Sequence, residues 1–283
     1  MTRVKTVLLV AALIVVAAAV AGVVGAGAAI ALVKTSYNGP VDDFTRTELA
    51  VHSKALGESV ILGVHVPVEY AAQPERRFPV LWVLDGPSQG LDIHRATQTL
   101  SRIGAAEPAI VVEVPHSSSG RDDDFRPPVE EGVSWGGQAD RFLRFLETEA
   151  FPAVEESYRT DSVRMLVGHS LGGFFALFAY TERPALFDAY FAFSPSVWVG
   201  GEVIVPMLEG ALRQPSPEGA FLYVSVGALE GNEMAAGFDA VRKTLETYAP
   251  AALRWQTEVT AGADHGSNPI LSYPVAVSQY WAH

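Results

Sequence analysis

The chain of 283 residues contains no cysteine. This absence excludes disulfide bonds and a cysteine-based site for lipid attachment, so the folded part must be stabilised by its core alone. The sequence also lacks a His-Glu-x-x-His motif and any cluster of histidines with the spacing of a zinc site. The acidic run Asp122–Asp124 lacks the spacing and the glycine of a calcium loop. We therefore expect no metal ion.

Basic residues are also scarce. The chain has 20 Lys and Arg against 32 Asp and Glu, a net charge of −12. Removing Arg3, Lys5 and Lys34, which flank the first hydrophobic segment, leaves 17 basic and 32 acidic residues, a net charge of −15. Such a charge disfavours nucleic acids and anionic membrane surfaces as partners of the folded part. No motif points to a protein partner.

One long hydrophobic run lies at the N-terminus. Arg3 and Lys5 precede 27 uncharged residues, Val7–Val33. The apolar part of a secretory signal usually has about 7–15 residues, whereas a membrane-spanning helix needs about 20. The length favours an uncleaved anchor helix, but Ala26–Ala28 and Ala29–Ala31 resemble cleavage sites, so a cleaved signal stays open. In both cases the positive residues keep the N-terminus inside, and the rest of the chain is exported.

The remainder divides into a linker, residues 35–40, and one domain, residues 41–283, after the N-terminal segment 1–34. In this domain short apolar stretches alternate with helical patterns. This alternation predicts an α/β fold with a mostly parallel central sheet and helices on both faces. The expected strands are Phe44–His52, Ser59–Pro67, Pro79–Leu84, Ala109–Val114, Val163–Val167, Tyr190–Phe193, Phe221–Val226 and Leu253–Thr260. The expected helices are Leu91–Ile103, Gln138–Tyr158 with a kink at Pro152, Phe174–Tyr180, Glu233–Thr247 and Val275–Trp281, and Pro115–Gly137 is expected to be a polar loop.

The most informative motif is the sequence Gly168-His169-Ser170-Leu171-Gly172, between an apolar strand and an apolar helix. A G-x-S-x-G sequence in this context is the nucleophile elbow of α/β-hydrolases, in which a tight turn exposes the serine hydroxyl above the sheet. A second copy, Gly86–Gly90, places Ser88 in the same pattern. The stretch after Ser88 alternates like a half-exposed helix and follows only the third strand, so we favour Ser170 as the nucleophile.

A serine nucleophile needs a base, which in this fold is a histidine near the end of the chain. His265 lies in a loop of small residues after the last strand and is the expected base, since His283 is the terminal residue. The acid should follow the strand Phe221–Val226. Glu230 is preferred there, with Glu233 and Asp264 as alternatives.

The anionic intermediate of acyl transfer needs backbone N–H donors. One should be the amide of Leu171. The other should come from the loop after the third strand, where Pro87 has no N–H, so either Gly86 or Ser88 must supply it.

These residues resemble an esterase family of α/β-hydrolases that includes siderophore trilactone esterases, feruloyl esterases, S-formylglutathione hydrolases and mycolyltransferases. The resemblance covers nearly all of Phe44–Trp281 and is strongest to the branch of siderophore esterases. It rests, beyond the elbow, on the segments Ser53–Gly57, Val83–Gly86, Arg121–Pro127, Ala139–Leu143, Tyr158–Asp161 and Ser194–Trp198.

The resemblance implies a carboxylic ester hydrolase without cofactor that uses Ser170 and His265 on a small or soluble ester. Some members of the branch use a Ser–His pair alone, which leaves the role of Glu230 open. Trp198 and Asp85 would line the substrate pocket, although Trp198 could equally be a core aromatic beneath it. The acidic segment 121–126 argues against an anionic ferric siderophore. An acyltransferase and a non-catalytic, membrane-tethered binding protein remain as alternatives.

Overall fold

Eight strands form one sheet in the computed structural model, which describes residues 46–129, 136–215, 217 and 219–282. The strand order is β1-β2-β4-β3-β5-β6-β7-β8, with β1 and β2 antiparallel to their neighbours and β3 to β8 parallel. This is the predicted α/β-hydrolase architecture. The strands are β1 Arg46–Ser53, β2 Glu58–His65, β3 Phe78–Leu84, β4 Ile110–Val114, β5 Thr160–His169, β6 Ala189–Phe193, β7 Phe221–Gly227 and β8 Arg254–Thr260.

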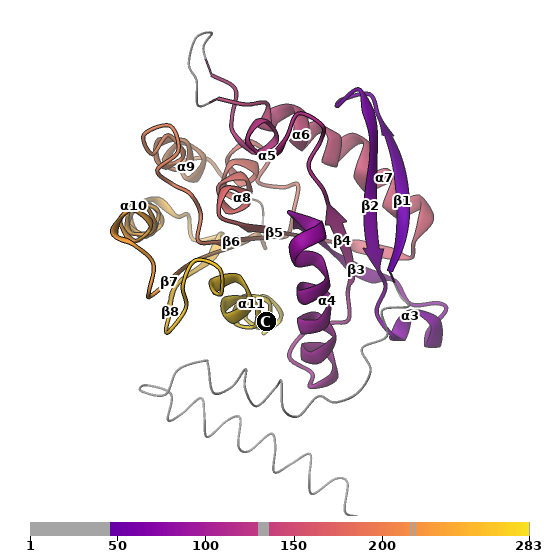
Figure 1. The fold of residues 1–283 in the computed structure, drawn as a ribbon. Coiled ribbons are helices and arrows are strands. Elements are labelled where there is room, and N and C mark those ends of the chain that lie inside the picture. The colour runs from indigo at the N-terminus through magenta and orange to yellow at the C-terminus, as the bar shows by residue number, and fades with distance from the viewer. Residues whose placement is uncertain (1–45, 130–135, 216, 218, 283) are drawn as a thin grey trace, which may run out of the picture.

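Helices cover both faces of the sheet (Figure 1). Two of them, α4 and α11, pack on one face with their own apolar core, and the helices from α6 to α10 pack on the other. Because both faces are covered, β3, β6 and β7 are buried along their whole length. The helices are α3 Glu69–Ala72, α4 Gly86–Arg102, α5 Arg121–Phe125, α6 Ala139–Phe145, α7 Phe151–Ser157, α8 Leu171–Glu182, α9 Ile204–Leu212, α10 Asn232–Tyr248 and α11 Asn268–Trp281.

The helices differ from the sequence prediction in several places: α3 was not expected, and α4 and α11 begin five and seven residues before the expected Leu91 and Val275. The expected loop 115–137 contains α5, and α9 was not predicted because its Pro206 and Gly210 weaken the helical pattern. The expected helix 138–158 is divided into α6, a π-helical turn Leu146–Ala150, and α7. Pro152 directly follows this π-helical turn, which accommodates the interruption that a residue without an N–H causes in a continuous helical run.

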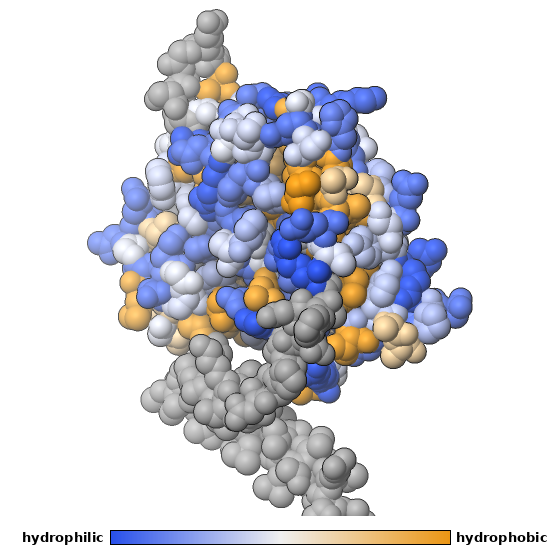
Figure 2. Space-filling model, turned by 45° about the vertical axis from the view of Figure 1, so that its right-hand side comes forward, coloured by the Kyte–Doolittle hydropathy of each residue, from blue (hydrophilic) through white to orange (hydrophobic). Residues whose placement is uncertain are grey.

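The predicted hydrophobic segment Val7–Val33, its anchor or signal role and the linker 35–40 lie outside the described residues. Within the part that the structure describes, no helix combines the length and apolar character needed to cross a bilayer. Figure 2 shows a surface on which hydrophilic side chains dominate and hydrophobic patches are small.

A buried polar cluster joins α4 to the sheet. His94 is 1% exposed, and its ring stacks on that of His65 with 4.8 Å between centroids. The His65 Nε2 lies 2.7 Å from the Oε1 of Glu113. Burial lowers the pKa of His94 to about 4, and the neighbouring charges of His65 and Arg95 act in the same direction. His94 is therefore neutral in the folded protein at pH 7.

This cluster predicts a loss of stability in mild acid. The folded pKa of His94 lies below its ordinary value of 6.5. Between those two values the unfolded state binds more protons, so the free energy of unfolding falls as the pH falls through that window. Each such histidine changes the free energy of unfolding by up to about 1.4 kcal/mol per pH unit within its window. Burial lowers the pKa of His169 to about 4 as well, so two groups act together.

Urea unfolding at pH 7, 6 and 5 measures this slope. We expect His94→Phe, which keeps a ring against His65 but cannot titrate, to lower the slope of the unfolding free energy against pH. The expected decrease is up to about 1.4 kcal/mol per pH unit, the contribution of one proton. His52→Gln, on the exposed surface of β1, should leave the slope unchanged. An identical slope in wild type and His94→Phe would contradict the prediction.

Candidate active site

Ser170 occupies the turn between β5 and α8. Its backbone angles, φ 60° and ψ −120°, are strained for a residue with a side chain. The turn is held on both sides, since the Ser170 amide donates to the carbonyl of Phe193 at 2.9 Å and its carbonyl accepts from Phe174 at 3.0 Å. The geometry is that of the predicted nucleophile elbow.

The flanking glycines make this turn possible. A Cβ atom on Gly168 would lie 2.1 Å from the carbonyl oxygen of Gly172, a backbone atom that cannot move without opening the turn. A Cβ on Gly172 would lie 3.2 Å from the carboxylate of Asp85. Glycine is therefore required at both positions, because the chain packs too closely around this turn to leave room for a side chain.

The crowding at Gly168 predicts opposite effects of one substitution at two sites. Gly168→Ala should lower the free energy of unfolding by about 3 kcal/mol, near the upper end for overpacking, because it meets backbone. Gly210→Ala should raise it by about 0.5–1 kcal/mol, because Gly210 lies in α9 with no atom within 4 Å of the added Cβ. Urea unfolding of the two variants checks both signs, and a Gly168→Ala variant as stable as wild type would contradict the steric argument.

The second G-x-S-x-G sequence does not form an elbow. Ser88 lies in the first turn of α4, where its amide donates to the carbonyl of Asp85 at 2.9 Å and its hydroxyl to the same oxygen at 2.8 Å. Both the amide and the hydroxyl of Ser88 are thus used for hydrogen bonds within the first turn of the helix. A helical residue whose hydroxyl donates to its own turn lacks the strained backbone of a nucleophile elbow.

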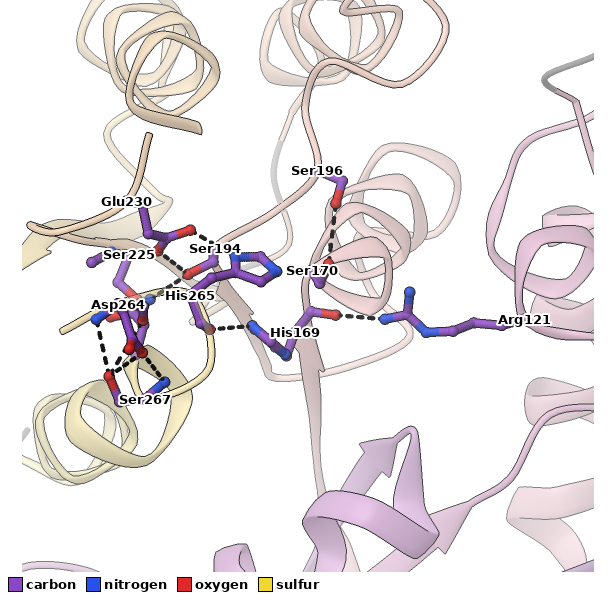
Figure 3. A network of polar contacts seen from close by, with 12 residues as sticks. Arg121, His169, Ser170, Ser194, Ser196, Ser225, Glu230, Asp264, His265 and Ser267 are labelled. Carbon is purple, nitrogen blue, oxygen red and sulfur yellow. Dashed lines mark hydrogen bonds and ion pairs between the residues drawn. The ribbon is translucent and has the colours of Figure 1, made fainter. Parts of the chain in front are cut away.

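The predicted base and acid lie side by side. The Nδ1 of His265 is 2.7 Å from the Oε2 of Glu230. The carboxylate accepts from Nδ1–H, which leaves Nε2 as the ring nitrogen without a proton. Figure 3 shows the imidazole of His265 between Glu230 and Ser170. The structure therefore brings together the three residues expected to form the catalytic group.

The two alternative acids do not contact the base. The carboxylate of Asp264 accepts hydrogen bonds from the amide and the hydroxyl of Ser267, at 2.8 and 2.6 Å. Glu233 is exposed in the first turn of α10. Of the three carboxylates weighed from the sequence, Glu230 is the one bound to His265.

A buried network behind Glu230 was missed by sequence reasoning. The Glu230 side chain is only 1% exposed, and its Oε1 accepts from the hydroxyl of Ser194 and the amide of Gly227, each at 2.6 Å. Asn268 in turn donates to the hydroxyls of Ser194 and Ser225, at 2.8 and 3.0 Å. These donors stabilise a buried carboxylate. The sequence offered one signal for this network, the position of Ser194 and Ser225 at the carboxyl ends of β6 and β7.

The structure reduces the candidate oxyanion donors to one pair of amides. Leu171 and Gly86 are the first residues of α8 and α4, so their amides have no intrahelical acceptor. The amide of Ser88 already donates to Asp85, and the expectation that it could be a donor is wrong. Gly86 remains as the partner of Leu171 predicted from the loop after β3.

The two residues expected in the pocket differ in their surroundings. Trp198 is 45% exposed in the turn after β6, so it is not a core aromatic. Nearby in this turn, the hydroxyl of Ser196 lies 3.3 Å from that of Ser170. Asp85 is buried, and its carboxylate is bound by Arg121 and His116. Asp85 therefore offers no free carboxylate to a substrate, contrary to the expected pocket role.

Arg121 and His116 stabilise the negative charge of Asp85. Burial by itself would raise the pKa of Asp85, but the hydrogen bonds from Arg121 and His116 outweigh it and hold the pKa below its usual value. The group is a buried, ionised carboxylate at neutral pH.

The carboxylates of the acidic segment that follows β4 are bound by neighbouring groups. Asp122 pairs with Arg126 at 2.8 Å, and Asp124 is buried and accepts from the amide and hydroxyl of Ser117. Asp123 accepts from Gln138 at 3.0 Å. In the described ranges no three His, Cys, Asp or Glu side chains are grouped to hold a metal ion. Of the three carboxylates, only that of Asp122 is shown paired with a cation, while those of Asp123 and Asp124 accept from neutral donors.

A model of a known family matches most of the chain. A family model described as "Putative esterase" matches residues 53–265, from the end of β1 to the candidate base. The chain belongs to this esterase family. The family expected from the sequence is thus confirmed.

Individual relatives match part of the chain. It is 34% identical over 158 residues to a siderophore triacetylfusarinine C esterase of Aspergillus fumigatus, which covers 50% of this chain and 53% of that protein. It is 32% identical over 143 residues to the ferri-bacillibactin esterase of Bacillus subtilis, which covers 44% of this chain and 50% of that protein. The chain thus spans about half the length of these curated relatives.

Solved structures match most of the fold. A BES protein from Bacillus cereus is 25% identical with a TM-score of 0.74, covering 86% of this chain and 97% of that chain. An IroE-like serine hydrolase from Shewanella oneidensis is 23% identical with a TM-score of 0.75, covering 83% and 79%. These similarities confirm the α/β-hydrolase fold.

Proposed function

We propose that this esterase is a serine-dependent carboxylic ester hydrolase that acts through an acyl-enzyme. The observation that carries the proposal is the 2.7 Å contact between Glu230 and His265 beside the strained Ser170. A buried carboxylate that orients a histidine toward a serine on a tight turn is the arrangement that activates a hydroxyl nucleophile.

In this mechanism the Ser170 hydroxyl attacks the ester carbonyl carbon while its proton passes to Nε2 of His265. The amides of Leu171 and Gly86 stabilise the negative charge that develops on the carbonyl oxygen. Nε2 then gives the proton to the alkoxide oxygen of the leaving alcohol. A water molecule, deprotonated by the same nitrogen, attacks the acyl carbon. Nε2 then returns this proton to the Ser170 oxygen as the bond to the acyl group breaks and the acid is released. The negative charge of Glu230 stabilises the imidazolium in both steps.

For the substrate we propose a small, soluble siderophore ester. Support comes from two relatives described as esterases of siderophores. The structural argument against such a substrate is weakened, since Asp122 is paired with Arg126 and Asp124 is buried against Ser117. The position of the domain outside the cytoplasm, tethered or released, remains our proposal from residues 1–34.

The test uses the full chain and two assays. A fluorophosphonate should label the wild-type protein at Ser170, located by peptide mass spectrometry. Hydrolysis of triacetylfusarinine C, bacillibactin and p-nitrophenyl esters of increasing chain length, followed by product analysis, identifies the substrate class. Absence of labelling in the folded protein would contradict the serine mechanism and support a non-catalytic binding protein. Transfer of the acyl group to an added alcohol in preference to water would instead support an acyltransferase.

A further inference from the structure

The oxyanion site is assembled from two distant segments. Leu171 belongs to the start of α8, whereas Gly86 follows β3. On the second segment Pro87 has no N–H and the amide of Ser88 is bound to Asp85, so the whole contribution of the segment depends on where Gly86 lies. Donors to an oxyanion act only when they are fixed at about 2.7–3.1 Å from the developing charge.

Asp85 sets the position of Gly86. Its backbone has φ 54° and ψ 32°, the left-handed conformation that residues with a side chain rarely adopt. The carboxylate is held by two parallel hydrogen bonds from Arg121, Nε to Oδ1 at 2.7 Å and Nη2 to Oδ2 at 2.9 Å. His116 adds a third contact at 2.7 Å. This bidentate pairing fixes direction as well as distance.

The same guanidinium reaches the nucleophile elbow. The Nη2 of Arg121 also donates to the carbonyl of His169 at 3.1 Å, the residue immediately before Ser170 (Figure 3). One planar group thus joins the segment of Gly86 to the turn that carries Ser170 and Leu171. Lysine could not replace it, because an ammonium group lacks this planar arrangement of donors.

His169 continues the connection to the base. Its Nε2 lies 2.8 Å from the carbonyl oxygen of His265, and the two rings are 4.6 Å apart between centroids. A carbonyl only accepts, so Nε2 of His169 carries the proton. The His169 side chain therefore ties the loop of the base to the elbow.

We propose that Arg121 and His169 are positioning residues of this esterase, forming a chain of contacts from Asp85 through Arg121 and His169 to His265. The chain fixes the oxyanion segment and the base loop relative to Ser170, although neither residue touches the reacting atoms. The proposal rests on the serine mechanism above. It predicts effects on the chemical step, since a displacement of about 1 Å at a catalytic group costs about 100-fold in rate.

The first experiment measures kcat and KM for a p-nitrophenyl ester with Arg121→Ala and Arg121→Lys. We expect kcat to fall about 10- to 100-fold in both variants while KM changes less than about threefold. Guanidinium chloride at millimolar concentration should restore part of kcat to Arg121→Ala, and methylammonium chloride should not. Arg126→Ala, in the same segment but paired with Asp122, is the matched control and should keep the wild-type kcat.

The second experiment compares His169→Gln with His169→Phe. Glutamine can donate to the carbonyl of His265, whereas phenylalanine keeps only the ring contact, so kcat should be retained better by glutamine. Thermal unfolding and circular dichroism establish that each variant is folded, and if Arg121→Ala is not folded, Arg121→Lys decides.

The outcomes separate the two proposals. An active wild-type enzyme whose kcat is unaffected by both Arg121 substitutions, or is lowered equally by Arg126→Ala, would overturn the positioning role and leave the serine mechanism intact. The positioning role is also overturned if guanidinium does not restore kcat to a folded Arg121→Ala variant. A wild-type enzyme that neither hydrolyses esters nor reacts with fluorophosphonate would overturn the proposed function itself.

Discussion

Replacing Ser170 with alanine is expected to lower kcat for ester hydrolysis by about a millionfold. The hydroxyl is the atom that forms the acyl-enzyme, and no neighbouring group can take its place in the same geometry. Ser196 lies 3.3 Å away, but it follows β6 and is not on the strained turn between β5 and α8. The variant should remain folded, because alanine removes the hydroxyl and adds no atom to the crowded turn.

The measurement is steady-state hydrolysis of a p-nitrophenyl ester, with fluorophosphonate labelling as a second observation on the same samples. Ser88→Ala is the matched control, since Ser88 occupies the other G-x-S-x-G sequence and should keep the wild-type rate and labelling. Labelling that persists in Ser170→Ala and disappears in Ser88→Ala would reverse the assignment. A rate that persists in both would place the chemistry elsewhere on the molecule.

The second large effect is expected from Glu230→Gln, with kcat reduced about 10³- to 10⁴-fold, as for an amide in place of a triad carboxylate. The glutamine oxygen can still accept from Ser194 and Gly227, so the fold tolerates the change. Its NH₂ group then faces Nδ1 of His265 and donates to it. That hydrogen bond moves the imidazole proton to Nε2, and a protonated Nε2 cannot accept the proton of Ser170.

This prediction decides whether the enzyme uses a triad or a Ser–His pair. Glu233→Gln is the control, because it removes the same charge from the exposed start of α10 without touching His265. We expect its kcat to equal that of the wild type. If Glu230→Gln behaves like the control, His265 acts without a carboxylate partner, and the buried network around Glu230 contributes to stability alone.

Much of the architecture was predictable because it depends on local patterns. Strands buried on both faces are continuous apolar stretches, as in β3 and β7, and their positions agreed with expectation within a few residues. Helices with a proline or glycine inside them were predicted poorly. The helix α9 was missed, and the short α5 was taken for a loop because three aspartates in succession read as solvated chain.

The residues of the candidate site also differ in how far the sequence alone could predict them. Ser170 was predictable because the steric demand of its turn is met by glycines two positions away in the sequence. His265 was predictable from chain order and a loop of small residues. Glu230 was preferred over Glu233 and Asp264 from its position after the strand, but all three lie close to where the acid was expected, and only the fold determines which carboxylate faces Nδ1.

By itself, then, the sequence determined the α/β-hydrolase fold and pointed to Ser170 and His265 as candidate nucleophile and base, because the alternation of elements, the glycines of the turn and the chain order are all read from the sequence. Only the tertiary structure decided that Ser88 has no free amide, that Asp85 is held by Arg121, and that His169 contacts the loop of His265. Arg121 and Asp85 are 36 positions apart, and His169 and His265 are 96 apart. Hydrogen bonds act over about 3 Å, so such partners are chosen by where the folded chain brings them and not by their spacing in the sequence.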